Sequence, residues 1–184
     1  MDDPAVKTSR NSLLRVSEVA IDGGAGLIGI TICPGKVDPH AMTGPTERDL
    51  DIDVRTIHDW GARAVLTLME DAELALLHVT ALGATVERYG MEWVHLPIRD
   101  LAIPDASFER AWKRAGPRLE GLLLEGERVL VHCRGGLGRS GMIAARMLVE
   151  LGTPADEAIA RVRSARPGAV ETSEQVAYVR AVRP

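Results

Sequence analysis

The sequence predicts an α/β fold in which a central, mostly parallel sheet is flanked by helices. Three observations support it: strand-like runs alternate with helix-like patterns from about residue 13 onward, no internal repeat is visible, and 46% of the 184 residues are hydrophobic. A chain of this length can bury one sizeable core. We therefore predict a single domain over residues 13–184, preceded by a flexible tail over residues 1–12.

The first half of the chain is expected to begin with two antiparallel strands and a helix. The glycine-rich turn at 22–26 separates two apolar runs of strand length, and Leu50, Val54 and Ile57 recur at helical spacing. Thr46 is the predicted helix N-cap. The expected elements are strands over 14–21 and 27–32, a helix from Thr46 to Gly61, a strand over 64–69, helical structure over 71–89 with a break near Gly83, and a strand over 92–96.

The second half is expected to alternate helix, strand and two further helices. Phe108, Trp112 and Leu119 fall at helical spacing, although Pro117 should kink or interrupt the helix that carries them. The next helix is apolar on nearly every side, so it should be buried against the sheet. The expected elements are helical structure over 108–123, a strand over 129–131, and helices over 142–151 and 156–165.

Composition argues against several classes of partner. The 22 basic and 26 acidic residues leave a formal charge of −4, which gives no sign of a nucleic-acid or membrane partner. No stretch approaches the roughly 20 apolar residues of a membrane span, and residues 1–11 lack the apolar core of a signal peptide. We therefore expect a cytoplasmic protein, while its oligomeric state is left open.

The cysteines and histidines do not form a metal or disulfide pattern. Cys33 and Cys133 are the two cysteines and lie one hundred residues apart, and the five histidines are scattered without the spacing of paired ligands. No metal or cofactor is therefore expected. For Cys33, packing in the core is the simpler interpretation, and a disulfide with an oxidised Cys133 is the alternative.

Residues 132–141, His-Cys-Arg-Gly-Gly-Leu-Gly-Arg-Ser-Gly, carry the strongest chemical signal. A strand ending at His132 and a helix beginning near Gly138 place the loop at a helix N-terminus, which attracts an anion. The same positive environment should hold Cys133 as a nucleophilic thiolate. The residues expected to bind the substrate phosphate are Arg134, Gly135, Gly136, Leu137, Gly138 and Arg139.

Three further side chains of this loop have expected roles. Arg139 offers a planar fork for two phosphate oxygens. Ser140 can place its hydroxyl near the Cys133 sulfur and stabilise the thiolate when a phosphoenzyme breaks down. His132 can orient the loop through hydrogen bonds. A merely structural glycine turn would not require this whole combination, so we predict a catalytic phosphate site.

Cys133 and Arg139, with five residues between them, resemble the His-Cys-x5-Arg-Ser/Thr signature of the cysteine-dependent protein phosphatases. Segments 97–100, 104–105 and 163–175 extend the resemblance to the cyclin-dependent kinase inhibitor 3 (kinase-associated phosphatase) branch of the dual-specificity enzymes, over residues 25 to 182 in total. The resemblance implies a protein-tyrosine-phosphatase-like fold and a cysteinyl-phosphate intermediate. It also implies an aspartate on a separate loop that protonates the leaving oxygen.

Asp100 is the residue that matches this general acid. It follows a predicted strand, so it should lie at the same carboxyl edge of the sheet as Cys133. Asp105 is the alternative, although its position before a helical pattern suits an N-cap. Gln175 resembles the second glutamine of a loop in larger tyrosine phosphatases and is expected to support the site, whereas Glu171 stands where their water-orienting glutamine would be.

Two arginines of the last third remain ambiguous from sequence. Arg163 and Arg166 can support the phosphate loop from behind, or they can be solvated charges on an exposed helix face.

A phosphorylated protein is the expected substrate, carrying phosphotyrosine, phosphoserine or phosphothreonine. The resemblance lacks the tyrosine-recognition segment of larger receptor-like enzymes, and the loop interior has one cation, Arg134, beside the apolar Leu137. A multiply phosphorylated headgroup would gain little from it. The alternatives are a phosphatase of a lipid, an RNA end or a small phosphoester, a catalytically silent phosphate-binding module, and a sulfurtransferase.

Overall fold

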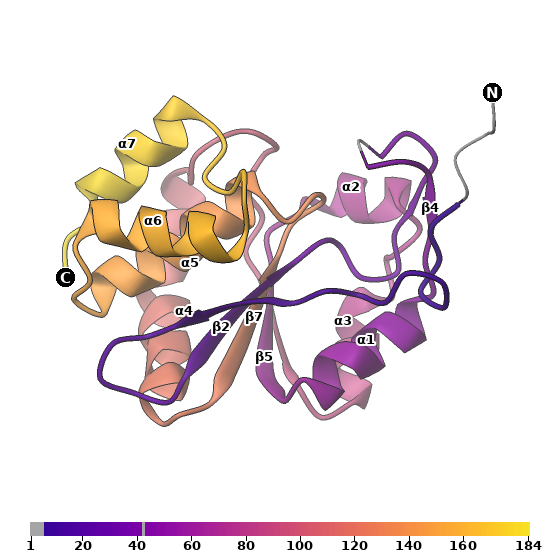
Figure 1. The fold of residues 1–184 in the computed structure, drawn as a ribbon, viewed down its shortest axis with the longest axis horizontal. Helices are drawn as coiled ribbons and strands as arrows, with labels where there is room; N and C mark the ends of the chain where they lie inside the picture. The colour runs from indigo at the N-terminus through magenta and orange to yellow at the C-terminus, as the bar shows by residue number, and fades with distance from the viewer. Residues whose placement is uncertain (1–5, 42) are drawn as a thin grey trace.

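The computed structural model describes residues 6–41 and 43–184, and its main sheet has five strands (Figure 1). These strands are β1 (Ser17–Ala20), β2 (Leu27–Thr31), β5 (Ala62–Thr67), β6 (Glu92–His95) and β7 (Arg128–His132). Their spatial order is β1-β2-β7-β5-β6, with β1 antiparallel to β2 and the other neighbours parallel. A separate two-stranded ribbon pairs β3 (Val37–Asp38) with β4 (Thr46–Glu47). The predicted α/β fold with a mostly parallel sheet is confirmed.

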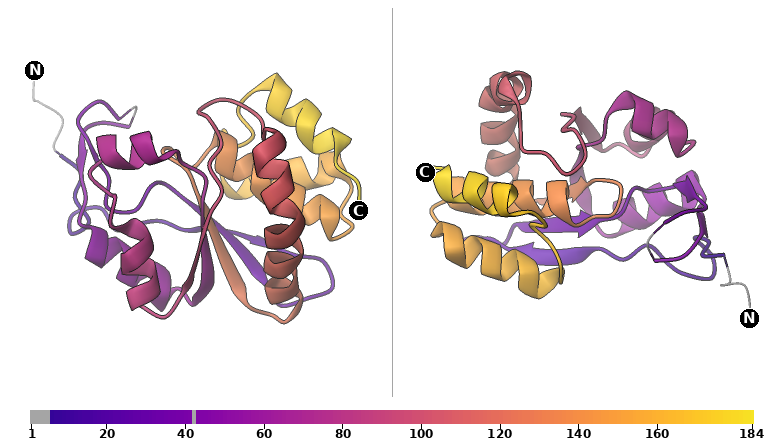
Figure 2. Two further views of the ribbon diagram at one scale, coloured as in Figure 1. Left: turned by 180° about the vertical axis from the view of Figure 1, so that it is seen from behind. Right: turned by 90° about the horizontal axis from the view of Figure 1, so that it is seen from above.

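Seven helices of the described residues lie on the two sides of this sheet. They are α1 (Leu50–Asp59), α2 (Asp71–Leu76), α3 (Leu82–Arg88), α4 (Ala106–Leu124), α5 (Gly138–Glu150), α6 (Ala155–Ala165) and α7 (Ser173–Ala181). Helices α1 to α3 lie on one side of the sheet and α4 to α7 on the other (Figures 1 and 2), and α7 packs on α5 and α6. The core lies between the layers. As predicted, α5 is buried along nearly its whole length.

The N-cap of α1 differs from the prediction. Asp49 caps the helix, since its side chain accepts a hydrogen bond from the Ile52 amide at 2.9 Å. Thr46 instead pairs with Asp38 in the β3–β4 ribbon. The predicted end of the helix at Gly61 agrees with its left-handed backbone, φ +93°, directly after the helix.

The predicted break near Gly83 is present at residues 77–81, between α2 and α3, while Gly83 itself is helical. Chain direction changes at His78, whose φ is +60°. Gly83 lies inside α3, where a Cβ atom would come within 2.3 Å of the Trp93 ring. Close packing of helix on strand, which the sequence pattern does not reveal, therefore explains this glycine.

Of the two predicted effects of Pro117, a kink or an interruption, the interruption is wrong, because α4 continues through it from residue 106 to 124. A proline removes the hydrogen bond to the carbonyl four residues earlier, here that of Lys113. Both residues are on the exposed side of the helix. Water can therefore solvate the released carbonyl, and the helix retains its apolar contacts on the opposite side.

The described part of the expected N-terminal tail is bound to the domain. The Lys7 amide donates to the Pro45 carbonyl at 2.9 Å, and the Glu47 amide donates to the Lys7 carbonyl at 3.0 Å. Ser9 is buried and donates to the Asp49 carbonyl. Residues 6–12 therefore contact the edge of the β3–β4 ribbon, while residues 1–5 lie outside the described part of the chain.

The parallel strands β2, β5, β6 and β7 place their carboxyl ends at one edge of the sheet. The segments that follow these strands meet there, at the upper side of Figure 1 and facing the viewer in the right panel of Figure 2. They comprise residues 32–36, 68–70, 96–105 and 133–137. This edge is the place where open α/β sheets bind ligands.

Asp53 of α1 forms a buried ion pair with Arg48 that stabilises the part of the fold around α1. Its carboxylate accepts from Arg48 at 2.7 and 2.9 Å and from the Gly35 amide at 2.8 Å. Removing one partner of such a pair leaves the other charge buried. We expect Asp53→Ala to lower the free energy of unfolding by about 3–5 kcal/mol, measured by urea denaturation.

The matched control is Asp156→Ala, which removes an exposed carboxylate that pairs with Arg180. Exposed pairs contribute little, so this variant should unfold close to the wild-type midpoint. Equal midpoints for Asp53→Ala and Asp156→Ala would contradict the stabilising role of the buried pair.

Candidate active site

Cys133 begins a loop, here called the Cys133 loop (residues 133–137), that connects β7 directly to the N-terminus of α5. Its side chain is buried, and its Sγ lies 3.4 Å from the Ser140 hydroxyl. The structure therefore brings together the cysteine and hydroxyl that the sequence singled out. The sulfur therefore lies at a helix N-terminus, where backbone N–H groups have no partner within the helix.

Two glycines of the sequence motif are required by close contacts. Gly136 has φ +66°, and a Cβ atom there would come within 2.5 Å of the Thr31 carbonyl oxygen. A Cβ atom on Gly138 would come within 2.9 Å of the Glu171 carboxylate and 3.1 Å of the Gln175 side-chain amide. Larger residues at these positions would displace the loop or its neighbours.

Carbonyl groups of the Cys133 loop accept hydrogen bonds from two cationic side chains. The Arg134 carbonyl accepts from Lys36 Nζ at 3.4 Å. The Gly135 and Gly136 carbonyls accept from the Arg166 guanidinium at 3.2 and 3.0 Å. Of the two interpretations of Arg166, support of the loop is therefore the one that the structure bears out.

This arrangement fixes the direction of the loop amides. The described peptide bonds are trans, so each carbonyl and the following N–H point in opposite directions. The amides of Gly135, Gly136 and Leu137 therefore point away from Lys36 and Arg166. On that side of the loop they can donate to an anion at the N-terminus of α5.

Arg163 supports the same loop through an intermediate segment. Its guanidinium donates to the Ala169 and Val170 carbonyls at 3.0 and 2.9 Å. The Val170 amide in turn donates to the Leu137 carbonyl at 3.3 Å. Arg163 is therefore bound rather than simply solvated, and it holds the segment that packs on the loop.

The Arg139 guanidinium is the buried cation of the site, with its side chain 1% exposed. It donates to Glu73 at 2.6 and 2.8 Å and to the Ile98 carbonyl at 2.9 Å, and it lies 3.0 Å from Asp100. Burial is the largest single influence and opposes its charge, but Glu73, Cys133 and Asp100 together outweigh burial, so the pKa of Arg139 is raised. Arg139 therefore stays charged at the centre of the site.

The two candidate acids have different surroundings. The Asp100 side chain is 58% exposed and faces Arg139. Asp105 is the N-cap of α4, since its Oδ1 accepts from the Phe108 amide at 2.8 Å. It also lines an open cleft of about 920 Å³ between the start of α2 and the start of α4. The capping interpretation of Asp105 is confirmed.

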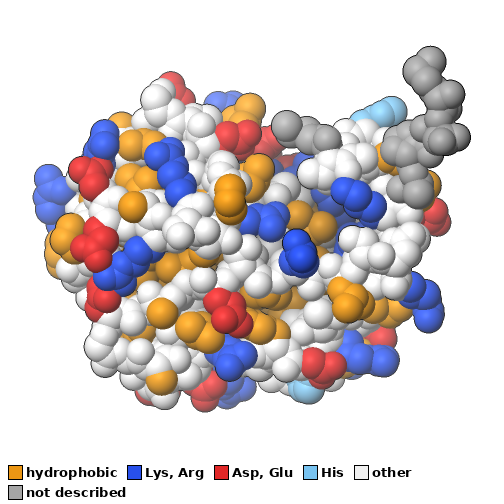
Figure 3. Space-filling model, viewed as in Figure 1, with side chains coloured by type: hydrophobic (Ala, Val, Ile, Leu, Met, Phe, Trp, Pro, Cys, Tyr) orange, Lys and Arg blue, Asp and Glu red, His pale blue; other side chains and the backbone are white. Residues whose placement is uncertain are grey.

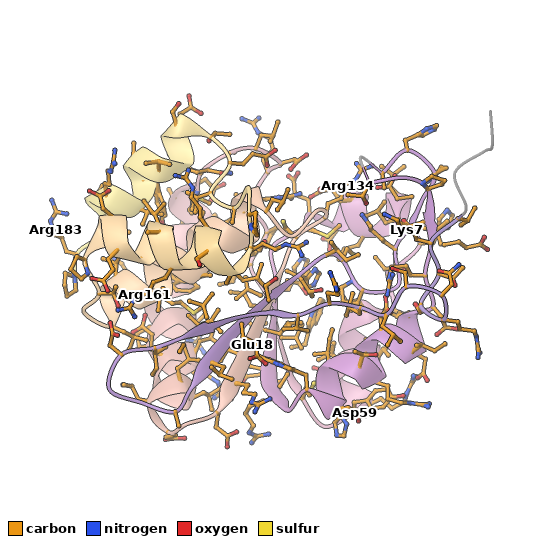
Figure 4. All side chains as sticks on the ribbon, viewed as in Figure 1. Lys7, Glu18, Asp59, Arg134, Arg161 and Arg183 are labelled. Carbon is orange, nitrogen blue, oxygen red and sulfur yellow. The ribbon has the colours of Figure 1, made fainter. Side chains whose placement is uncertain are left out.

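Arg134, expected among the phosphate-binding residues, directs its guanidinium to Asp38. Their three nitrogen–oxygen contacts are all 3.1 Å, and Lys36 Nζ lies 3.9 Å from the same carboxylate. Figure 4 shows Arg134 beside the part of the molecule that carries α2 and β4. The main chain of Arg134 belongs to the Cys133 loop, while its side chain connects the loop to the β3–β4 ribbon through Asp38.

His132 is buried below the loop and neutral. Its Nε2 lies 2.7 Å from the Thr67 hydroxyl, which also accepts from the Trp93 indole at 2.9 Å. Burial lowers the pKa of His132 to about 3. This hydrogen bond connects β7 to the neighbouring strand β5, so the role of His132 in orienting the loop stays a prediction.

Gln175 connects two segments around the loop. Its side-chain oxygen accepts from the Glu171 amide at 2.9 Å, and its side-chain nitrogen donates to the Ala102 carbonyl at 3.3 Å. Gln175 is fully buried. It therefore fastens the Asp100 segment to the start of α7, next to Gly138.

Cys33 lies close behind the loop as a free, buried thiol. Its amide donates to the Arg134 carbonyl at 3.3 Å. Burial raises the pKa of the Cys33 thiol, so it stays protonated. The packing interpretation agrees with this burial, and a disulfide with Cys133 stays a hypothesis.

Three polar residues of this site were not identified from the sequence: Lys36, Asp38 and Glu73. Each acts through a partner far along the chain, so no local pattern marks it. The only usable signal was position, because Lys36 and Glu73 closely follow the parallel strands β2 and β5.

Across residues 6–41 and 43–184 the structure contains no group of three or more histidine, cysteine or acidic residues that could hold a metal ion. No helix in this range is long and apolar enough to cross a membrane. On the face shown in Figure 3, basic and acidic side chains are interspersed.

Comparison with known proteins was made on both sequence and structure. The family model described as the Swiss Army Knife protein, DSP-PTPase phosphatase domain (PTP-SAK), matches residues 34–184. Cyclin-dependent kinase inhibitor 3 of Rattus norvegicus is 30% identical over 171 residues, which cover 91% of this chain and 76% of that protein. Protein tyrosine phosphatase type IVA 3 of Homo sapiens is 29% identical over 140 residues, covering 76% and 75%.

Solved structures of similar proteins agree with these sequence relationships. Kinase-associated phosphatase, with serine in place of its catalytic-site cysteine, superposes with a TM-score of 0.80 at 24% identity, covering 91% of this chain and 93% of that chain. The active form of Tk-PTP superposes with a TM-score of 0.64 at 30% identity, covering 89% and 95%. The chain therefore belongs to the DSP-PTPase family of protein phosphatases.

Proposed function

We propose that this phosphatase hydrolyses phosphate monoesters of phosphorylated proteins through a cysteinyl-phosphate intermediate on Cys133. The main supporting observation is that two pairs of residues meet at one edge of the sheet: Cys133 with Ser140, and Arg139 with Asp100. This chemistry needs a nucleophile, a hydroxyl group, a permanent cation and a carboxyl group close together.

In the first step, the Cys133 sulfur attacks phosphorus and the bond to the leaving oxygen breaks. Arg139 and the loop amides bind the phosphoryl oxygens, and Asp100 gives its proton to the leaving oxygen. In the second step, water attacks phosphorus, the phosphorus–sulfur bond breaks and Asp100 takes the proton back. The Ser140 hydroxyl stabilises the departing Cys133 thiolate.

A phosphorylated protein is the proposed substrate. Similarity to a kinase-associated phosphatase and to protein tyrosine phosphatases supports this class. The Arg134 guanidinium is paired with Asp38, so the loop offers little additional positive charge for a second phosphate. Steady-state hydrolysis of phosphotyrosine and phosphothreonine peptides, a phosphoinositide and a 5′-phosphorylated RNA tests this. Preferred turnover of the last two would overturn the proposal.

We expect Cys133→Ser to abolish turnover while the fold and phosphate binding persist. The serine hydroxyl has a far higher pKa than the thiol, so the nucleophile is lost but the anion site remains. Hydrolysis of an aryl phosphate and binding of inorganic phosphate are the two measurements. Cys33→Ser is the matched control and should retain turnover, because Cys33 is buried behind the loop. Turnover by Cys133→Ser at the wild-type rate would refute the mechanism.

We expect Arg139→Lys to lower kcat/KM by about 10²–10³-fold, the range for losing one preorganised donor in an active site. A lysine cannot reproduce the planar, two-point geometry that Arg139 uses with Glu73. Arg134→Lys is the comparison, and its loss should be much smaller because that guanidinium pairs with Asp38. Similar losses in both variants would argue against a special role for Arg139.

We expect Asp100→Asn to lower kcat by about 10²–10⁴-fold on phosphotyrosine or phosphothreonine peptides. The loss should be far smaller on an aryl phosphate with an acidic phenol, because that phenol leaves without protonation. The readout is the ratio of the two losses, measured under saturating substrate.

Asp105→Ala separates the two acids. It removes an N-cap, so the free energy of unfolding should fall by about 0.5–2 kcal/mol without a leaving-group-dependent loss of kcat. If the leaving-group dependence followed Asp105→Ala instead of Asp100→Asn, the proton donor would be Asp105.

A further inference from the structure

Three residues other than glycine have a left-handed backbone in the described part of the chain. They are His78, Leu101 and Val170, with φ of 60°, 60° and 54°. A side chain with a Cβ atom makes this conformation unfavourable, so it persists only where something offsets the strain. Local structure accounts for two of the three.

His78 is explained by the end of α2. Its amide donates to the Ala75 carbonyl at 3.1 Å, and the Val79 amide donates to the Leu74 carbonyl at 2.9 Å. This pair of bonds is a Schellman motif, which requires a left-handed residue directly after the helix.

Val170 is explained by burial and hydrogen bonds. Its side chain is 1% exposed, its amide donates to the Leu137 carbonyl, and its carbonyl accepts from Arg163. The packing of this segment on the Cys133 loop therefore offsets its strain.

Leu101 has no comparable local explanation. It is the third residue of a turn closed by a hydrogen bond from the Ala102 amide to the Arg99 carbonyl at 3.0 Å. A turn with positive φ at this position is of type II, where glycine or asparagine is the usual residue. The leucine side chain is 53% exposed and does not belong to the residues that pack on the core. The fold alone does not require leucine here.

Leu101 is the neighbour in the chain of Asp100, the proposed proton donor. It follows Asp100 directly, and its amide donates to the Asp100 carboxylate at 3.1 Å. On another side of the Arg139 guanidinium lies Glu73 of α2, and Leu76, one turn later, is 65% exposed. Exposed leucines therefore follow both carboxylates that contact Arg139.

We propose that Leu101 is a specificity-determining residue that contacts an apolar side chain next to the phosphorylated residue of the substrate. This inference rests on the proposed function, because it assumes that a phosphorylated protein binds at Arg139. When the phosphorylated residue binds at Arg139, the residues on either side of it in the substrate come close to the segment that carries Asp100 and Leu101. Burial of the two apolar surfaces against each other then favours substrates that carry such a side chain.

The test uses two phosphotyrosine peptides that differ only in having leucine or serine on both sides of the phosphorylated residue. We expect the wild-type protein to prefer the leucine peptide by about tenfold in kcat/KM, the lower end of the discrimination that an apolar contact supplies. Leu101→Asn should remove this preference, because asparagine tolerates the left-handed turn but offers no apolar surface. Leu101→Met should retain most of it.

Leu124→Asn is the matched control, since Leu124 is 62% exposed at the opposite end of α4. It should keep both the preference and the turnover of an aryl phosphate. Equal rates on the two peptides for the wild-type protein, or an unchanged preference in Leu101→Asn, would overturn the inference and leave the proposed function standing. A wild-type protein that hydrolyses the aryl phosphate but neither peptide would overturn both.

Discussion

The buried charge of Arg139 is the constraint on which the active-site edge depends. A guanidinium that is 1% exposed must be paired, because an unpaired buried charge costs several kcal/mol or more. Its partners come from two different strand ends, since Glu73 follows β5 and Ile98 and Asp100 follow β6. Pairing Arg139 therefore fixes three segments of the chain relative to one another before any substrate binds.

The Cys133 loop is held in place by cations on the side that faces away from the anion site. Lys36 and Arg166 bind its carbonyl oxygens, which directs the following amides to the side where an anion can bind. The loop is therefore preorganised by cations behind it rather than by the ligand. Such preorganisation is what makes amide donors effective at stabilising charge that develops during a reaction.

The sequence predicted the features that depend on neighbours in the chain. The spacing of Cys133 and Arg139, the strand before them and the helix after them are local, and the carboxyl edge followed from strand direction. Glu73 escaped prediction because its partner, Arg139, is 66 residues away. The role of Gly83 was not identified for the same reason, since the Trp93 ring on another element requires a glycine there. Long-range contacts of this kind leave no periodicity to detect.

The two carboxylates that pair with Arg139, those of Glu73 and Asp100, differ in the free energy needed to separate them from it. Glu73 is 15% exposed and also accepts from the Glu70 amide at 2.9 Å, so its departure would leave a buried charge poorly paired. Asp100 is 58% exposed, and water can solvate it when it leaves. In the proposed mechanism, a phosphoryl group that binds Arg139 is therefore expected to displace Asp100 rather than Glu73. In the proposed mechanism this exchange frees the Asp100 carboxyl group at the moment when a leaving oxygen arrives beside it.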